Sequence, residues 1–129
     1  MRTAGAVMAA GALGAAVRYA VGLALQPAHA GAFPWGTLAA NLLGCLLLGL
    51  LAGGADRLKL PAVWREAAGA GFIGSFTTFS AFSMETVGLL DAGRTGLAAV
   101  YVLLSMAAGY ALAWAGLATG RRLQGAGAS

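Results

Sequence analysis

The chain has 129 residues, of which 60% are hydrophobic and only 9% are charged, with a net charge of +4. A soluble domain carries about 25% charged residues, so the composition excludes a soluble globular protein and indicates a single integral membrane domain, residues 1–129. Nucleic-acid binding is not expected, because the basic residues flank apolar runs instead of gathering on one module.

Four apolar segments are each long enough to cross a bilayer, which takes about 20 helical residues. They cover approximately residues 4–25, 35–55, 67–90 and 95–119. The sequence therefore predicts an all-α, multi-pass protein of the cell inner (plasma) membrane with four transmembrane helices. A cleavable leader ending at Ala28-His29-Ala30 is disfavoured, because the apolar run continues past Arg18 to Leu25 and exceeds a typical signal core.

The first segment holds Arg18, inside the span or at its edge. Ionisable residues at such positions are costly and usually face a cavity or a partner. Arg18 could form an ion pair with Glu85, which lies at a similar depth near the end of the third segment, or extend to the lipid headgroups. It could also attract an anion at the mouth of a pathway, and these interpretations are compatible.

The second segment carries Thr37 and Asn41, four residues apart and so on one helical face. An unpaired amide in lipid is strongly unfavourable, so Asn41 needs a partner. An interhelical hydrogen bond is the usual explanation for a lone intramembrane asparagine.

The third segment contains the most unusual stretch of the chain, Gly71 to Phe82. Several of its residues are poor helix formers: Gly74, Ser75, Thr77, Thr78 and Ser80. A helix broken at membrane depth frees backbone groups that lipid cannot satisfy, so a break persists only in protein or beside a wet or ion-holding cavity. The stretch predicts an ion or substrate site near mid-membrane. The alternative is a continuous helix whose hydroxyls bond to their own carbonyls.

Aromatic and hydroxyl side chains add to this inventory. Phe79 and Phe82 share a helical face, and the electropositive ring edges can meet an anion, although ordinary core or lipid contact is the alternative. Tyr101 and Ser105 supply two hydroxyls in the fourth segment. With many donors and Glu85 as the only carboxylate within the spans, the interior favours a small anion.

Three stretches carry a family resemblance: residues 11–19 (GALGAAVRY), 35–44 (WGTLAANLLG) and 71–86 (GFIGSFTTFSAFSMET). They resemble the Fluc-type (CrcB) fluoride channels. The resemblance implies a passive, fluoride-selective channel, not an enzyme, that exports fluoride from the cytoplasm and relieves its toxicity. It also implies a dual-topology dimer, in which two four-helix subunits pack antiparallel and enclose two pores.

The resemblance also implies roles for individual residues. Asn41 would donate to fluoride, and Phe79 and Phe82 would line the pathway as an aromatic box. The backbone carbonyls of Gly74 and Thr77 would hold a structural sodium ion at the dimer interface. The other residues of the predicted fluoride pathway are Thr37, Ser80, Tyr101, Ser105 and, at the entrance, Arg18. Ala81 departs from the family pattern, which usually has a hydroxyl residue there, and leaves Thr78 and Ser80 to carry a local polar role.

The basic residues predict an orientation but complicate the assembly. Six of them would share one side of the membrane: Arg2, Arg57, Lys59, Arg65, Arg121 and Arg122. This bias predicts both termini in the cytoplasm, whereas an antiparallel homodimer needs both orientations. We expect a homodimer over a heterodimer with an inverted homologue. The alternative function, a small dimeric multidrug-type transporter, requires an acid in the first helix, which offers only Arg18.

Overall fold

The computed structural model describes residues 1–25, 31–55 and 59–125. All regular structure in these ranges is helical, which confirms the all-α prediction. The helices are α1 (Arg2–Ala24), α2 (Trp35–Gly54), α3 (Ala62–Glu66), the π-helix η1 (Ala67–Ile73), α4 (Gly74–Phe76), α5 (Phe79–Asp91) and α6 (Thr95–Gly125). The disfavoured cleavage motif at 28–30 lies outside the described residues, as does Arg57.

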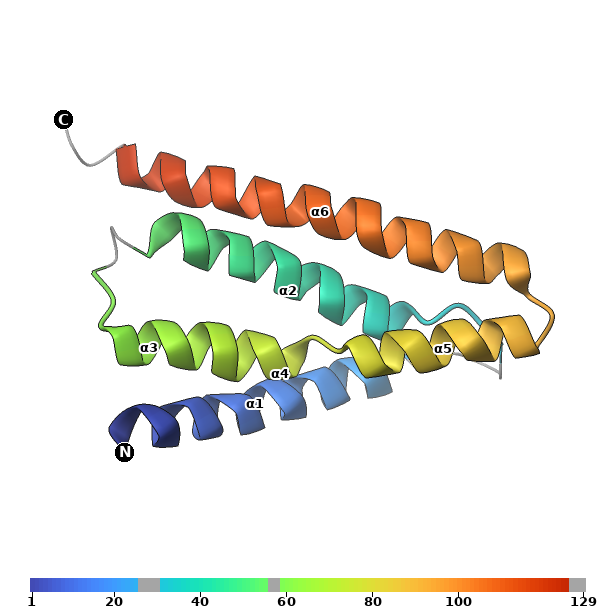
Figure 1. The fold of residues 1–129 in the computed structure, drawn as a ribbon, viewed down its shortest axis with the longest axis horizontal. Helices are drawn as coiled ribbons and strands as arrows, with labels where there is room; N and C mark the ends of the chain where they lie inside the picture. The colour runs from blue at the N-terminus through green and yellow to red at the C-terminus, as the bar shows by residue number, and fades with distance from the viewer. Residues whose placement is uncertain (26–30, 56–58, 126–129) are drawn as a thin grey trace.

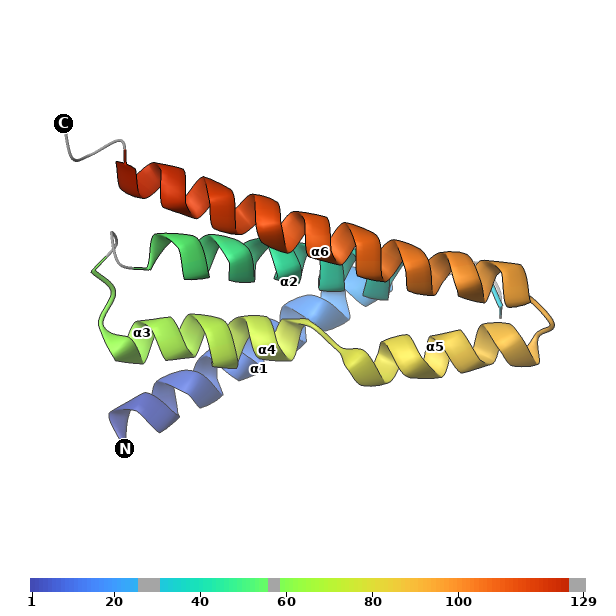
Figure 2. The same cartoon turned by 45° about the horizontal axis from the view of Figure 1, so that its top comes forward.

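The helices form an elongated bundle with two chain directions (Figure 1). Helix α1 and the run from α3 to α5 point one way, whereas α2 and α6 point the other way. Helix α1 packs on η1 and α4, and α2 packs on α6; turning the bundle shows α1 crossing the others obliquely (Figure 2). The start of α1 and the end of α6 therefore lie at one end of the bundle, and the α5–α6 turn lies at the other.

Three helices among the described residues are long and apolar enough to cross a membrane. They are α1, α2 and residues Thr95–Arg122 of α6, so the prediction of several membrane-spanning helices is confirmed. The third predicted segment is instead divided among α3, η1, α4 and α5, of which α5 is the longest at 13 residues.

Small residues allow α2 and α6 to approach closely. A Cβ added at Gly49 would overlap the backbone of α6, and one added at Gly116 would overlap the backbone of α2. The spacing of such small residues lets helix backbones touch in a membrane. On α6 the close approach involves Gly116 and Gly120, whereas Ala107 and Ala111 are exposed.

A second packed region surrounds Tyr101, which is 0% exposed. It joins α2, α5 and α6 through Leu38, Leu89 and Ala98, with Phe82 packed against the cluster. The cluster fixes the beginning of α6 against the end of α5, and so positions the chain on one side of the interruption described next.

The helical ladder is interrupted between α4 and α5. Thr77 and Thr78 have extended backbone, with φ/ψ of −83°/155° and −149°/120°. The Thr78 hydroxyl then caps α5 by accepting from the Ala81 N–H at 3.2 Å. Of the poor helix formers in this stretch, only these two threonines leave the helix; Gly74, Ser75 and Ser80 stay helical.

A π-helix precedes the interruption, which the sequence did not predict. Residues Ala67–Ile73 form this wider turn, and they lie directly on α1: a Cβ added at Gly14 would overlap the Phe72 carbonyl. π-turns within helices are rare and frequent at functional sites. Apolar small residues suit α- and π-turns alike, so the residue pattern could not distinguish them.

Candidate functional site

Asn41 on α2 forms two hydrogen bonds with the backbone of Thr78. Its Nδ2 donates to the Thr78 carbonyl at 3.1 Å, and its Oδ1 accepts from the Thr78 N–H at 2.8 Å. The interhelical bond expected of a lone asparagine is therefore confirmed. These contacts use one of the two N–H donors of the amide. Asn41 also lines a cavity of about 440 Å³, described below.

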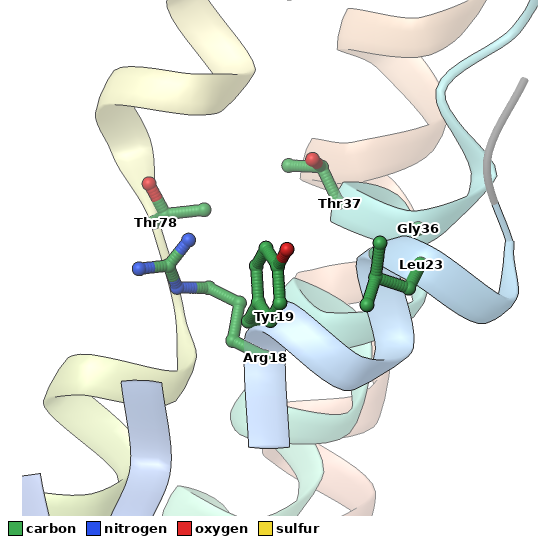
Figure 3. Close-up of a pocket in the computed structure, with 7 residues that line it drawn as sticks. Arg18, Tyr19, Leu23, Gly36, Thr37 and Thr78 are labelled. Carbon is green, nitrogen blue, oxygen red and sulfur yellow. The ribbon is translucent and has the colours of Figure 1, made fainter. Parts of the chain in front are cut away.

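Arg18 on α1 supports the other side of the interruption. Its Nε donates to the Ser75 carbonyl of α4 at 3.2 Å, and Figure 3 shows the guanidinium beside the link at Thr78. The ion pair with Glu85, one of the interpretations open for Arg18, does not form between these two described residues. A guanidinium can satisfy a backbone carbonyl as well as a carboxylate, and the carbonyl is the nearer partner here.

Glu85 instead accepts hydrogen bonds from two hydroxyls of the predicted pathway. Thr37 Oγ1 donates to Oε1 at 2.6 Å, and the Tyr101 hydroxyl donates to Oε2 at 2.7 Å. Sequence reasoning considered Glu85 only as a partner for Arg18 and missed this role. The available signal was that a lone carboxylate in apolar helices needs donors, and that α2 and α6 offered two hydroxyls.

Two cavities adjoin the interruption. The smaller, of about 260 Å³, is lined by residues of α1, by the start of α2 and by Thr78 (Figure 3): Arg18, Tyr19, Gly22, Leu23, Gly36, Thr37 and Thr78. The larger, of about 440 Å³, gathers most other predicted site residues: Asn41, Gly74, Thr77, Phe79, Phe82 and Ser105. Thr78 lines both. The predicted site residues that line a cavity thus fall into two groups, and Thr78 lies between them.

The larger cavity combines aromatic rings with an unpaired hydroxyl. Phe79 and Phe82 lie with ring centroids 5.9 Å apart and planes tilted by 33°. The Ser105 hydroxyl oxygen is buried and has no hydrogen-bond partner among the described residues. Phe79 is 80% exposed in the single chain, so its packing needs lipid or another subunit.

Two predicted pathway residues lie outside the lining of both cavities. Tyr101 is fully buried beneath Phe82, with ring centroids 5.0 Å apart. Ser80 is exposed on α5, and its hydroxyl lies 3.2 Å from that of Thr78. The structure therefore places Tyr101 behind Phe82 and Ser80 beside Thr78.

At the interruption, two backbone carbonyls lose the N–H donors that a continuous helix would provide. In a continuous helix, the N–H of residue i bonds to the carbonyl of residue i−4. The Thr78 N–H goes to Asn41 instead of Gly74, and the Ala81 N–H goes to Thr78 Oγ1 instead of Thr77. Backbone carbonyls released in this way suit a hard cation, which takes about six oxygen ligands. The Gly74 and Thr77 carbonyls could therefore supply some of the oxygen ligands of the sodium ion that the family resemblance implies.

The chain is similar to known proteins over most of its length. The pattern of the family described as "CrcB-like protein, Camphor Resistance (CrcB)" matches residues 5–117. A protein of Symbiobacterium thermophilum named fluoride-specific ion channel FluC 2 is 51% identical over 111 residues, which cover 85% of this chain and 90% of that protein. The fluoride-specific ion channel FluC of Agrobacterium fabrum is 43% identical over 118 residues, covering 91% and 94%.

The matched region includes every residue of the two cavities and of the interruption. The relatives named here are ion channels and not enzymes, and the long apolar helices make the chain a multi-pass inner-membrane protein. By the extent of the family match and the identity of its relatives, this chain belongs to the CrcB family.

Proposed function

We propose that this protein is a passive fluoride-selective channel that lets fluoride leave the cytoplasm and so relieves fluoride toxicity. The observation that carries the proposal is the larger cavity, where an amide, an unpaired serine hydroxyl and two phenylalanine rings come together without a lining carboxylate among the described residues. The names of the relatives support the same ion.

The proposed selectivity follows from dehydration. Fluoride is small and strongly hydrated, so a pathway must replace its water with well-placed donors. Asn41 offers an N–H, Ser105 an O–H, and Phe79 and Phe82 electropositive ring edges. Chloride is larger and would fit the same donors poorly. Uncharged HF enters a cell and dissociates in a less acidic cytoplasm, and the channel gives the trapped anion a downhill exit.

The proposed assembly is an antiparallel, dual-topology dimer with two pores. Each chain would be one domain with four crossings, the third composed of α3, η1, α4 and α5 and broken at mid-membrane. The 80% exposure of Phe79 and the exposure of Gly74 support a second subunit that covers both. We favour a homodimer over a pair with an inverted homologue.

The proposed cofactor is one structural sodium ion at the dimer interface. The Gly74 and Thr77 carbonyls of each subunit would hold it, so two chains would supply four oxygens. The bound cation would join the subunits and reduce the electrostatic cost of bringing an anion into a dry core. Arg18, Thr37 and Thr78 would form the polar approach to the pathway, while Ser80 and Tyr101 would support Thr78 and Phe82.

Purified protein in liposomes tests the proposal directly. Fluoride and chloride efflux are recorded with ion-selective electrodes, and empty liposomes are the control. We expect rapid fluoride efflux and little chloride efflux. Absence of fluoride efflux, or equal efflux of the two halides, would falsify the proposed function.

A further inference from the structure

We infer that Asn41 is a positioning residue for the cation site, in addition to its place in the fluoride pathway. The inference rests on the sodium site of the proposed function. Asn41 would act through the Thr78 peptide: by taking the Thr78 N–H, it leaves the Gly74 carbonyl available to the ion.

Hydrogen bonds on either side select the Gly74 carbonyl. The Ile73 carbonyl accepts from both the Thr77 N–H at 3.0 Å and the Thr77 hydroxyl at 3.1 Å. The Ser75 carbonyl accepts from Arg18 Nε at 3.2 Å. Between them, Gly74 loses its helical donor to Asn41. The carbonyls before and after Gly74 are thus occupied, whereas Gly74 is exposed in the single chain and lines the larger cavity.

The two hydrogen bonds to Thr78 make Asn41 suited to this task. A planar amide that bonds both the N–H and the C=O of one residue restrains that residue's backbone orientation, as a neighbouring β-strand would. Loss of the bond to Oδ1 would free Thr78 to rotate its N–H back toward Gly74 and continue the helix. Because the peptide is held from α2, the cation site depends on packing between α2 and the interruption, not on the local sequence alone.

The same side chain therefore connects the two ion sites. Asn41 lines the larger cavity along with Gly74 and Phe82, and its remaining amide hydrogen is available there. The Oδ1 atom would hold the Thr78 N–H and so keep the Gly74 carbonyl free to bind the cation. The Nδ2 atom would donate to the anion. This division predicts that substitutions can separate the two effects.

Sodium-dependent stability tests the inference without measuring transport. Thermal unfolding of the purified protein is followed by tryptophan fluorescence while sodium is titrated against N-methyl-D-glucamine. A ligand that binds only the folded protein raises Tm with its concentration. We expect the Tm of the wild type to rise with sodium concentration. For Asn41→Leu, the sodium concentration that gives half of the rise in Tm should be roughly 10–100-fold higher, because loss of a residue that orients a metal ligand weakens binding by about this factor.

Two further variants sharpen the test. Asn41→Asp keeps an oxygen that can accept from the Thr78 N–H, so it should retain a sodium-dependent rise while losing fluoride flux. Ser83→Ala removes a hydroxyl that bonds only within α5, to the Phe79 carbonyl at 2.9 Å, and should retain the wild-type sodium response.

The outcomes distinguish this inference from the proposed function. Wild-type sodium dependence in Asn41→Leu overturns the inference, even if fluoride flux is normal in the wild type. If Asn41→Leu does not fold, loss of the sodium response in Asn41→Asp overturns it. A wild type that conducts fluoride without any sodium response overturns both the sodium site and this inference, and leaves the channel function standing.

Discussion

Gly44 on α2 lies against Thr77 so closely that a Cβ at Gly44 would overlap the Thr77 methyl group. A residue with no side chain thus faces the first residue of the interruption, one helical turn from the Asn41 contact with Thr78. The close approach and the hydrogen bonds occur on the same face of α2, so the position of the interruption depends on both.

Gly44→Ala should therefore destabilise the protein. The added methyl group must displace Thr77 or α2, and overpacking of this kind typically costs about 1–3 kcal/mol. The expected result is a lower Tm together with reduced fluoride flux. Gly88→Ala is the matched control, because a Cβ there meets nothing within 4 Å, and its Tm should equal or exceed that of the wild type.

Phe79→Ile and Phe82→Ile should each impair fluoride conduction. Isoleucine preserves bulk and apolarity but removes the electropositive ring edge proposed to meet the anion. Liposome efflux measures the effect. Phe72→Ile is the control, because Phe72 stacks on Phe76 at 5.9 Å and lines neither cavity. Normal conduction by both variants would contradict the ring-edge mechanism.

Tyr101→Phe should lower stability by about 1–3 kcal/mol, because it removes a buried donor from the Glu85 carboxylate. A double-mutant cycle with Glu85→Ala isolates the interaction, since the two residues are in direct contact and alanine has no side-chain acceptor. Urea- or heat-induced unfolding in detergent supplies the four free energies of unfolding. Additive effects of the two substitutions would show that the hydrogen bond contributes no stability.

Expression of the chain alone should settle how it assembles. Five exposed basic residues lie on α1, just before α3, on α3 and on α6, where these segments come to one end of the bundle: Arg2, Lys59, Arg65, Arg121 and Arg122. Their bias favours one orientation, whereas a dual-topology homodimer needs two. Reporter tags on the C-terminus should detect both orientations and the expressed chain should conduct fluoride. A single orientation with no conduction would instead point to an inverted homologue as partner.

The apolar pattern predicted the helices well because length and hydrophobicity alone decide whether a segment can span a bilayer. The predicted 35–55 and the observed Trp35–Gly54 differ by one residue. The final helix continues to Gly125, beyond the predicted 119. Gly120, a residue type that often ends a helix, stays helical here and packs against the backbone of Gly53 and Gly54 on α2.

The partners of the polar residues were harder to predict. Arg18 bonds to the Ser75 carbonyl and not to Glu85, and Glu85 bonds to Thr37 and Tyr101. These choices depend on how each helix is rotated about its own axis. In a soluble helix the polar face reveals that rotation, whereas α1 and α6 are apolar on all sides. The sequence could therefore place these residues at a similar depth without assigning the pairs.

Thr78 is the residue that the two cavities have in common. An ion that used both cavities would pass from one to the other at this residue. The free-energy barrier for losing its water would then lie close to Thr78, instead of extending across the roughly 30 Å hydrocarbon layer. The rate of ion conduction through such a protein would depend on the size and polarity of the Thr78 side chain, and hardly on the thickness of the surrounding bilayer.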